Sequence, residues 1–507
     1  MIETTRVRLA DALAALWPHG DVLPLPHDAT PICLTRDSRE VPHCPHPAVF
    51  IAVPGVMGDG RRFIGDALTA GAEWVLAEGE GEPAASESRT SWLPELGESL
   101  GELGRELFRV PASLSLIAVT GTNGKSSVTH YLAQLSTALG HPAGVVGTLG
   151  WGRLGALIDS GQTTPGALEL QAALGAMAAD GLERVAIEAS SHALAQQRLA
   201  GARVDTAVFT NLSRDHLDYH GSMAAYAAAK ARLFQRPELE HAVVNGDDPL
   251  TRLMLAGLPA GVRVLATGTA EATTLRVLDW LPHETGQRAL IATPDGERAL
   301  ELSLMGRFNL DNVLLAMAAL LGQGEDLDEL CRAAAELAPV PGRMQRLTRP
   351  GAPTVVVDYA HTPDALAHAL RALRDHLPGE GAATAKLWCV FGCGGDRDTG
   401  KRALMGEVAG READRVIVTD DNPRSEDPAA IREAILSGMS DAGRAAALSL
   451  EGRAAAIERA VADADAGDLI LVAGKGHETS QEIAGQRHPF SDEAAARQAL
   501  ARREARA

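Results

Sequence analysis

The sequence predicts an α/β protein of three domains with mostly parallel sheets. At 507 residues the chain is too long for one hydrophobic core, since about 150 residues per domain is usual. Short apolar segments of strand type alternate with segments of helical type. Several of the apolar segments end in loops with glycine or proline and charged residues, as in parallel sheets that present a ligand site at one edge. We therefore expect domains over residues 1–112, 113–340 and 341–507.

Composition and charge exclude several classes of protein. Hydrophobic residues make up 46% of the chain and aromatic residues only 4%, which is typical of a globular protein with an aliphatic core. The net charge of −19 argues against nucleic acid as a partner, so an anionic ligand must be met by a local basic site. The five cysteines form no Cys-x-x-Cys pair, which argues against a disulfide framework or a cysteine zinc site.

The N-terminal segment mixes charges with its apolar residues, which argues against a signal peptide. No uninterrupted apolar run reaches the ~20 residues that span a bilayer, so we expect no membrane insertion. A cytoplasmic location fits these features and the cysteine content.

Residues 1–112 have the pattern of a small α/β domain. We expect strands over 48–53 and 74–77, a helix over 63–70 and a polar surface loop over 79–91. The cluster Asp37-Ser38-Arg39 precedes the first strand. It either hydrogen-bonds a ligand or closes a turn, and taken alone it favours the turn.

Residues 116–129, LIAVTGTNGKSSVT, predict a strand, a small-residue loop and a helix that opens at Lys125. Gly121 and Gly124 allow the backbone N–H groups to converge on a phosphate, and the helix start adds its dipole. Lys125 then supplies a positive charge for the outer phosphates, and the Ser126 hydroxyl can hold Mg²⁺. Val119 stands where the general P-loop pattern has glycine, so an ordinary strand-to-helix turn is the alternative. The pattern favours a P-loop-type site for ATP.

Two further loops of residues 113–340 carry candidate metal ligands. Strand 183–187 ends at Glu188, and strand 207–210 leads into a loop that contains His216. Parallel strands would gather these side chains with the phosphate loop at one edge of a sheet. Each residue taken alone is more often an ordinary cap or loop residue. Together they form a plausible Mg²⁺ site of hard oxygen ligands, with an imidazole as a less typical member.

Lys230 is the most unusual residue of the central domain. It falls inside the apolar stripe of a helix expected over residues 222–234. Burial without a partner would lower its pKa and favour a neutral, nucleophilic amine. Alternatively its stem packs while the ammonium group reaches water, and spacing alone slightly favours this second interpretation.

Residues 341–507 predict a third, Rossmann-like α/β unit. Strands 387–391, 416–419 and 469–473 each end in a charged loop that contains glycine or proline. Arg397 and Arg424 follow the first two strands and offer bidentate recognition of a carboxylate. Glu478 follows the third strand and suits an ammonium group. The set favours a zwitterionic, amino-acid-like ligand.

Several long motifs in this order resemble the Mur ligases of peptidoglycan synthesis. They are the phosphate loop, EASSHAL at residues 188–194, NLSRDHLDYH at 211–220, DYAHTP at 358–363 and GKGHE at 474–478. The resemblance runs from about Asp37 to Glu478. It implies an N-terminal domain for a UDP group, a central ATPase domain and a C-terminal domain for an incoming amino acid, in an ATP- and Mg²⁺-dependent amide ligase of cell-wall synthesis. A folylpolyglutamate synthase has a similar phosphate loop, but the extra N-terminal domain opposes that reading.

The resemblance also implies roles for individual residues. Lys230 matches a lysine that is carbamylated in the family and would then join Ser126, Glu188 and His216 at Mg²⁺, with Lys125, Glu188, His216 and Lys230 as the catalytic set. The residues implied for ATP are Gly121, Thr122, Asn123, Gly124, Lys125, Ser126, Ser127, Asn309, Arg343, Asp358 and His361. The residues implied for UDP-MurNAc-L-Ala-D-Glu are Ser38, Thr163, Thr164, Ser190, Gln196 and Arg198. Arg36, where an apolar residue is expected, and Val56-Met57-Gly58 depart from the family pattern, and both departures concern the uridine contacts.

The loop Asp421-Asn422-Pro423-Arg424 resembles the signature of family members that add meso-diaminopimelate. The residues implied for this acceptor are Arg397, Asp421, Asn422, Pro423, Arg424, Gly474 and Glu478. Lysine lacks the second carboxylate and would leave an arginine unpaired, which opposes a lysine-adding ligase. A nucleotide-binding regulator without turnover is the alternative from another class, and the intact Lys125, Glu188, His216 and Lys230 oppose it. We expect the chain to act as a monomer.

Overall fold

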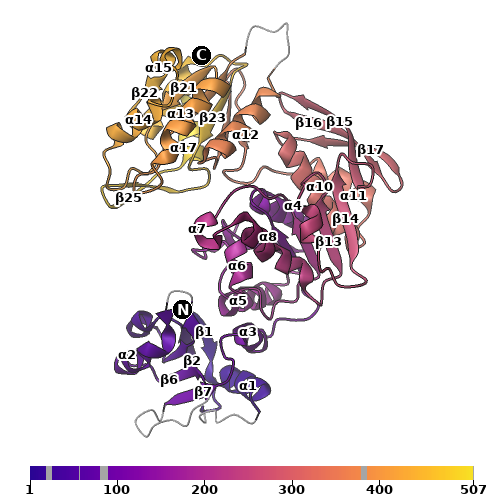
Figure 1. Ribbon diagram of the computed structural model, residues 1–507, viewed down its shortest axis with the longest axis vertical. Coiled ribbons are helices and arrows are strands. Elements are labelled where there is room, and N and C mark those ends of the chain that lie inside the picture. The colour runs from indigo at the N-terminus through magenta and orange to yellow at the C-terminus, as the bar shows by residue number, and fades with distance from the viewer. Residues whose placement is uncertain (19–24, 56–57, 80–88, 378–384, 506–507) are drawn as a thin grey trace. The chain divides into compact units, whose positions relative to one another are not determined.

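The computed structural model describes residues 1–18, 25–55, 58–79, 89–377 and 385–505 (Figure 1). The chain divides into two compact units, Met1–Leu265 and Ala266–Ala507. Both units mix helices with sheets that are largely parallel, so the predicted α/β class is confirmed. The boundaries of the three domains stay a prediction. No helix in the described ranges is both long and apolar enough to cross a bilayer.

The first sheet of unit 1 has the strand order β1-β2-β3-β6-β7, with only β1 antiparallel to its neighbour. Its strands are β1 (Ile2–Thr5), β2 (Pro31–Thr35), β3 (Ala48–Ala52), β6 (Trp74–Glu78) and β7 (Thr90–Leu93). Alternate residues of a strand face opposite sides of the sheet. Val49 and Ile51 therefore pack with α1 (Arg6–Leu16) and α3 (Leu100–Phe108), while Phe50 packs with α2 (Ile64–Thr69).

The strands and the helix predicted in this region are confirmed to within a few residues. The predicted loop over 79–91 is wrong at its end, because Thr90 and Ser91 are buried in β7, and its residues 80–88 lie outside the described ranges. The short elements here are η1 (Ser38–His43), β4 (Pro54–Gly55), β5 (Gly58–Asp59) and η2 (Gly60–Phe63).

The second sheet of unit 1 positions the phosphate loop. Its order within the unit is β10-β9-β11-β8-β12-β13, and all neighbours except β10 and β9 are parallel. The strands are β8 (Ser115–Thr120), β9 (Ala143–Gly147), β10 (Gly150–Arg153), β11 (Arg184–Glu188), β12 (Thr206–Phe209) and β13 (His241–Asn245). The helices are α4 (Lys125–Ala138), α5 (Ala167–Ala179), α6 (Ser191–Ala195), α7 (Leu217–His220), α8 (Met223–Ala231), η3 (Arg232–Gln235) and α9 (Thr251–Met254). Because β11, β8 and β12 are adjacent and parallel, their carboxyl ends meet at one edge, as the sequence predicts.

Unit 2 begins with a region that departs from the expected alternation of strands and helices. β14 (Arg263–Gly268) crosses the division between the units and runs parallel to β15. β15 (Leu275–His283), β16 (Gly286–Thr293) and β17 (Gly296–Leu302) then form an antiparallel meander without helices between them. Pro294-Asp295 makes the second turn, and Gly296, the first residue of β17, has φ +110°. Helices α10 (Arg307–Gly322) and α11 (Leu327–Ala334) follow.

The C-terminal sheet has the order β18-β19-β23-β20-β21-β22, with only β18 antiparallel. Its strands are β18 (Gln345–Leu347), β19 (Thr354–Asp358), β20 (Leu387–Phe391), β21 (Arg415–Val418), β22 (Leu448–Ser449) and β23 (Leu469–Ala473), and β24 (Ser480–Ile483) and β25 (Gln486–Pro489) form a separate hairpin. The helices are α12 (Pro363–Arg374), α13 (Gly400–Glu412), α14 (Pro428–Leu436), α15 (Asp441–Ala446), α16 (Arg453–Asp463) and α17 (Asp492–Glu504).

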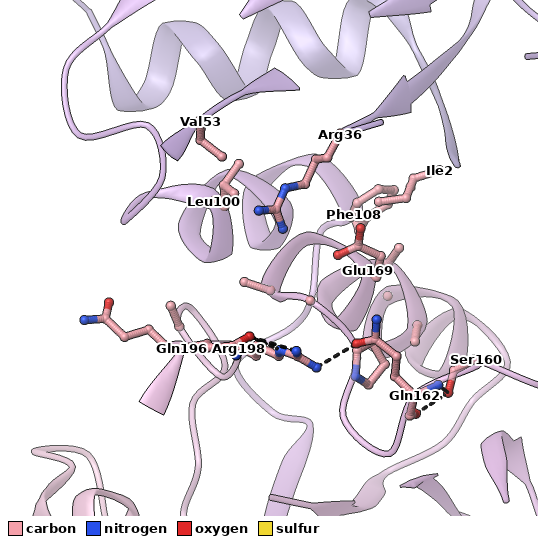
Figure 2. Close-up of a pocket in the computed structure, with 18 of the residues that line it drawn as sticks. Ile2, Arg36, Val53, Leu100, Phe108, Ser160, Gln162, Glu169, Gln196 and Arg198 are labelled. Atoms are coloured by element: carbon pink, nitrogen blue, oxygen red, sulfur yellow. Dashed lines mark hydrogen bonds between the residues drawn. The ribbon is translucent and has the colours of Figure 1, made fainter. Parts of the chain in front are cut away.

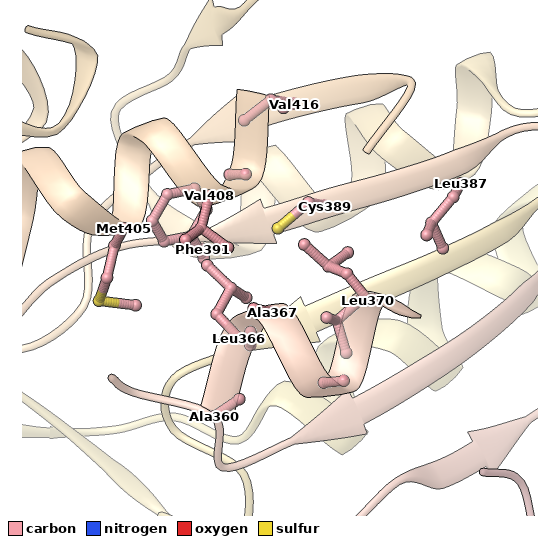
Figure 3. Close-up of a cluster of buried hydrophobic side chains, with 14 of the residues drawn as sticks. Ala360, Leu366, Ala367, Leu370, Leu387, Cys389, Phe391, Met405, Val408 and Val416 are labelled. Atoms are coloured by element: carbon pink, nitrogen blue, oxygen red, sulfur yellow. The ribbon is translucent and has the colours of Figure 1, made fainter. Parts of the chain in front are cut away.

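Two apolar layers cover this sheet. Leu387, Cys389 and Phe391 of β20 pack against α12 and α13, where Figure 3 shows them beside Leu370 and Val408. The intervening Trp388 and Val390 pack on the other side with residues of α16 and α17. This alternation places the strand ends, and not the strands themselves, at the surface where loops can bind ligands.

Candidate active site

The loop between β8 and α4 has the strand-loop-helix form that the sequence predicts. Gly121 and Gly124 have φ of +148° and +86°, the region that favours glycine. A Cβ atom at Gly121 would stand 1.9 Å from Thr210 Oγ1, so the close approach of the two loops requires glycine there. Lys125 Nζ donates to the carbonyl oxygens of Gly121 and Thr122 at 3.0 and 2.9 Å. The lysine thus folds back over the loop.

Glu188, at the end of β11, lies beside this loop. Its Oε1 accepts a hydrogen bond from Ser126 Oγ at 2.8 Å and one from the Thr148 N–H at 2.9 Å. Glu188 is only 1% exposed, and Gly147 leaves room for it, since a Cβ there would stand 2.2 Å from Glu188 Oε1. Two hard oxygen donors therefore adjoin each other at the start of α4, as Mg²⁺ prefers.

His216 lies among aromatic rings near the same loop. Its side chain is 46% exposed and its Nε2 is 3.4 Å from Asp215 Oδ2. Its ring centre is 4.8 Å from that of His192 and 6.1 Å from that of Tyr226, whose hydroxyl is 3.1 Å from Thr122 Oγ1. Among the described residues, no group of three or more His, Cys, Asp and Glu side chains is arranged to hold a metal ion.

Lys230, the last buried polar residue of α8, is enclosed by the phosphate loop. It is 1% exposed, its Nζ donates to Gly121 O at 2.7 Å, and Nζ lies 4.6 Å from the centre of the Tyr226 ring. The alternative in which its ammonium group reaches water is therefore wrong. Burial, assisted by the nearby positive charge of Lys125, holds the pKa of Lys230 well below its ordinary value.

Unit 1 also contains an open cavity of about 1870 Å³. Figure 2 shows Gln162, Gln196 and Arg198 on one side of it and Arg36 on another. Arg198 Nη1 donates to Gln162 Oε1 at 2.6 Å, its Nε donates to Gln196 Oε1 at 3.1 Å, and Gln196 Nε2 donates to the Tyr219 hydroxyl at 3.0 Å. Of the residues predicted for the UDP-linked substrate, Gln196 and Arg198 line this cavity. Arg36, which the sequence singled out only as a departure, lines it as well.

Three of the other predicted substrate residues connect the cavity to Glu188. Arg198 Nη1 donates to Thr164 O at 2.8 Å, and Thr164 Oγ1 donates to Glu188 O at 2.6 Å. Thr163 Oγ1 is 3.1 Å from Thr148 Oγ1, and Ser190 Oγ caps α6 by accepting from the Ala193 N–H. A continuous network of hydrogen bonds thus links Arg198 to the phosphate loop.

Ser38 opens η1 and is not among the residues that line the cavity. Asp37 caps that helix by accepting from the Arg39 N–H at 3.0 Å, and the two side chains form an ion pair at 2.6 Å. These contacts are those of the turn that the sequence favours for Asp37-Ser38-Arg39. Residues 56–58 were the other segment that departs from the family pattern. Residues 56 and 57 lie outside the described ranges.

Unit 2 holds the remaining residues predicted for ATP. The Arg343 guanidinium lies 4.5 Å from the centre of the Tyr359 ring, and His361 Nδ1 is 3.0 Å from Tyr359 O. Asp358 accepts hydrogen bonds from the Met344 and Ala360 N–H groups, although burial raises its pKa. The structure therefore gathers Arg343, Asp358 and His361 near Tyr359. Asn309 is 2% exposed in α10, where its Nδ2 donates to Met305 O.

Residues 420–424, here called the acceptor loop, follow β21. Arg397 and Arg424 come together near Gly394, where a Cβ atom would stand 2.9 Å from Arg424 Nη1 and 3.8 Å from Arg397 Cγ. Gly474 has φ +116°, and a Cβ there would stand 2.8 Å from Asp421 Oδ2. The predicted acceptor residues therefore lie at one end of the C-terminal sheet.

Glu478 is less available to bind a ligand's ammonium group than the sequence suggests. Its Oε2 accepts from Lys475 Nζ at 2.6 Å and from Asn422 Nδ2 at 2.9 Å. Burial acts to raise the pKa of Glu478, but the hydrogen bond and charge of Lys475 lower it overall. Lys475 is fully buried and was missed in the sequence, although its place in the GKGHE motif is a signal that could have found it.

Comparisons with known proteins identify the family of the chain. The chain matches the family model of the Mur ligase middle domain over residues 119–320 and that of the Mur ligase glutamate ligase domain over residues 342–476. The chain therefore belongs to the Mur ligase family.

Individual relatives match over nearly their whole length. A protein of Pseudomonas syringae pv. tomato named UDP-N-acetylmuramoyl-L-alanyl-D-glutamate–2,6-diaminopimelate ligase is 47% identical over 97% of this chain and 99% of its own. The protein of that name from Pseudomonas aeruginosa is also 47% identical, over 92% and 94%. A solved structure of a ligase of that name is 37% identical, with a TM-score of 0.72 over 97% of this chain and 99% of its own.

Proposed function

We propose that this chain is an ATP-dependent ligase that joins meso-2,6-diaminopimelate to the γ-carboxyl group of D-Glu in UDP-MurNAc-L-Ala-D-Glu, a step of peptidoglycan precursor synthesis. The observation that carries the proposal is the 47% identity, over nearly the full length of both chains, to proteins named for this reaction. The grouping of Arg397 and Arg424 beside Gly394 supports the same acceptor.

The reaction has two steps. The γ-carboxylate attacks the γ-phosphorus of ATP and gives an acyl phosphate and ADP. The acceptor amine then attacks the acyl carbon, and inorganic phosphate leaves with formation of the amide bond. No covalent nucleophile of the protein is needed, because positioning and charge stabilisation suffice for phosphoryl transfer.

The phosphate loop would bind ATP through the N–H groups of residues 121–127, with Lys125 turning from its carbonyl partners toward the phosphates. The network from Arg198 through Thr164 to Glu188 supports a substrate carboxylate held beside that loop. Asn309, Arg343, Asp358 and His361 remain the proposed contributors to ATP binding from unit 2. Ser38, Thr163, Ser190 and Gln196 remain proposed contacts of the UDP-linked dipeptide.

Mg²⁺ fits the donors beside the loop. The Ser126 hydroxyl and Glu188 carboxylate adjoin each other at 2.8 Å, and both are hard oxygen ligands. A carbamate on Lys230 would add a third oxygen ligand, with His216 as a further proposed member and ATP phosphates completing the set. The ion, when bound, would supply charge neutralisation at the phosphates.

Carbamylation of Lys230 requires a neutral amine, which attacks CO₂ and releases a proton. The lowered pKa of Lys230 supports that state, and the burial of Nζ against Gly121 O supports a fixed position for the product. The modification would convert the buried amine into an anion suited to a metal.

The test is phosphate release by the purified chain with ATP, Mg²⁺ and UDP-MurNAc-L-Ala-D-Glu, together with meso-diaminopimelate, L-lysine or no amino acid. We expect release only with meso-diaminopimelate, with a tripeptide product of the matching mass. Release with lysine instead would overturn the proposed acceptor. If none of the three reactions releases phosphate but the chain still binds ATP, the alternative of a nucleotide-binding regulator would be favoured.

A further inference from the structure

In the hairpin of β24 and β25, strand β24 and the turn residue Ala484 are hydrogen-bonded to the acceptor loop. The Arg424 N–H donates to Glu482 O at 3.0 Å, and the Ala484 N–H donates to Arg424 O at 2.7 Å. The Glu482 N–H donates to Asn422 Oδ1 at 3.0 Å, and Gln481 Nε2 donates to Asp421 O. Three of the four residues Asp421-Asn422-Pro423-Arg424 are therefore held by this hairpin.

Arg424 needs such support because of its backbone conformation. Its φ is +52°, in the left-handed region that residues other than glycine, asparagine and aspartate seldom adopt. The pair of hydrogen bonds to Glu482 and Ala484 fixes this conformation from both sides of the residue. The direction in which the Arg424 side chain leaves the loop is thus set by the hairpin.

The guanidinium group of Arg424 is held at two of its three nitrogens. Nη1 donates to Gly395 O at 2.7 Å, and Nε lies 3.3 Å from Glu482 Oε2. Within the described ranges, Nη2 has no hydrogen-bond partner. The contacts with Gly395 and Glu482 therefore orient the guanidinium group and leave Nη2 for a ligand carboxylate.

Glu482 is suited to orienting Arg424 without replacing a ligand there. It meets the guanidinium at Nε through one oxygen and leaves Nη2 for a ligand carboxylate. Its side chain is 34% exposed and that of Arg424 is 22% exposed, so the pair sits at the rim of the loop. An arginine fixed before binding loses less side-chain freedom when its ligand arrives.

We propose that Glu482 is a positioning residue, which holds Arg424 in the orientation that selects an acceptor with a second carboxylate. This inference rests on the proposed function. It assigns to the β24-β25 hairpin a part in substrate selection, although the hairpin lies after the GKGHE motif and carries no residue predicted to bind the acceptor.

The experiment compares Glu482→Ala, Glu482→Gln and Glu482→Asp in the full chain. Glutamine keeps an oxygen acceptor at the same reach, whereas aspartate keeps the charge but is one methylene shorter. Glu493→Ala is the matched control, since Glu493 forms an exposed ion pair with Arg497 on α17. The measurements are kcat, the KM values of meso-diaminopimelate and ATP, and the ratio of kcat/KM for meso-diaminopimelate to that for lysine.

For Glu482→Ala we expect the KM of meso-diaminopimelate to rise about fivefold and the acceptor ratio to fall by a similar factor, as loss of the partly exposed ion pair that orients the guanidinium implies. The KM of ATP and kcat should stay within about twofold, because Arg424 has no part in phosphoryl transfer. Glu482→Gln should recover most of the loss and Glu482→Asp should not. If the alanine variant does not fold, the glutamine and aspartate variants still decide the matter.

An unchanged KM for meso-diaminopimelate in Glu482→Ala, with an active wild type, would overturn this inference alone. So would a glutamine variant as weak as alanine, because charge and not orientation would then be the cause. Equal rises in the KM of ATP and of the acceptor would indicate general damage and would also overturn it. A wild-type chain inactive with meso-diaminopimelate would overturn the proposed function and this inference with it.

Discussion

The phosphate loop and the acceptor loop are fixed in opposite ways. At the phosphate loop, Lys125 and Lys230 bond to backbone carbonyl groups, and Lys230 and Glu188 are each 1% exposed. At the acceptor loop, Arg424 depends on the side chain of Glu482 and on a carbonyl group of another loop. The groups proposed for phosphoryl transfer are thus largely buried, while the Arg424–Glu482 pair proposed for acceptor choice is partly exposed.

This difference implies different responses to substitution. A change at the buried framework should remove turnover whatever the acceptor, because every acceptor needs the same acyl phosphate. A change at the acceptor loop should alter the KM of the acceptor amino acid and leave the KM of ATP unchanged. The following predictions test that contrast.

Replacement of Lys230 by methionine should have the largest effect. We expect kcat to fall at least about 1000-fold, or about 4 kcal/mol in activation free energy, because the proposed carbamate cannot form. The melting temperature should stay constant or rise, since a buried amine is replaced by an apolar side chain of similar size. Phosphate release and thermal melting check both parts.

Lys386→Met is the control for that substitution, because Lys386 is a partly exposed lysine in unit 2. It should leave kcat within about twofold, the range of a surface change without a catalytic contact. A Lys230→Met variant with more than about a tenth of wild-type kcat, which is a loss under 1.4 kcal/mol, would contradict the contrast between the two regions.

The buried pair of Arg453 and Asp492 provides the second test. Both side chains are 0% exposed at 2.6 Å, and Arg453 Nη2 donates to Ala473 O at the end of β23. Asp492→Ala would leave Arg453 buried without its carboxylate, so the free energy of unfolding should fall by about 3–5 kcal/mol. Denaturant unfolding measures this loss.

The neighbouring Glu493 gives a control on the same helix. Glu493→Ala removes an exposed ion pair and should cost less than about 1 kcal/mol. Similar losses for the two variants would mean that the buried ion pair contributes no more to stability than the exposed one.

The sequence predicted best those features that depend on local patterns. Around Lys125, an apolar strand segment, two loop glycines and the start of a helix all lie within fourteen residues. The structure confirms this strand, loop and helix. The three apolar strands of the C-terminal sheet were equally clear, because buried parallel strands read as short apolar runs.

Other features depend on which distant segments meet, and spacing could not reveal them. Lys230 lay in an apolar stripe, but only the approach of Gly121 decides that its amine is buried. Glu482 and Arg424 are separated by a helix-rich segment and pair through the tertiary fold. The antiparallel meander after β14 was missed, although Pro294, Asp295 and Gly296 are residue types that favour turns.

Arg424→Ala should have an intermediate effect on activity. Loss of a charge-assisted contact worth about 1.5–3 kcal/mol should lower kcat/KM for meso-diaminopimelate about 10- to 100-fold. The KM of ATP should not change, and the activity with lysine, which we expect to be low in the wild type, should change little. Steady-state kinetics with both acceptors measure the difference.

Arg444→Ala is the matched arginine control, because Arg444 pairs with Glu433 at the surface of the same domain. It should leave kcat/KM for both acceptors unchanged. Equal losses of activity with meso-diaminopimelate and lysine in Arg424→Ala would show that the arginine does not read the second carboxylate.

The smallest effect is expected at His376, a buried residue outside both regions. His376 is 1% exposed just after α12. Its Nδ1 is 2.9 Å from His283 O, and its Nε2 accepts the Gly306 N–H at 2.8 Å. These partners require a neutral ring with its proton on Nδ1, and burial lowers the pKa of His376 from its ordinary value of 6.5.

Because the folded pKa is below the unfolded one, unfolded chains bind the extra proton first as the pH falls below about 6.5. The stability that neutral His376 contributes is therefore complete above that pH and is lost as the pH falls through the folded pKa. His376→Gln should lower the free energy of unfolding by about 1 kcal/mol at pH 7.5, as loss of a hydrogen bond implies. It should also flatten the decline of that free energy between pH 6.5 and 5.

His368→Gln, at an exposed site on α12, should keep the wild-type decline. An undiminished acid decline in His376→Gln would assign the acid sensitivity to other groups, and the acceptor ratio should be the same in both histidine variants because neither residue contacts the acceptor loop.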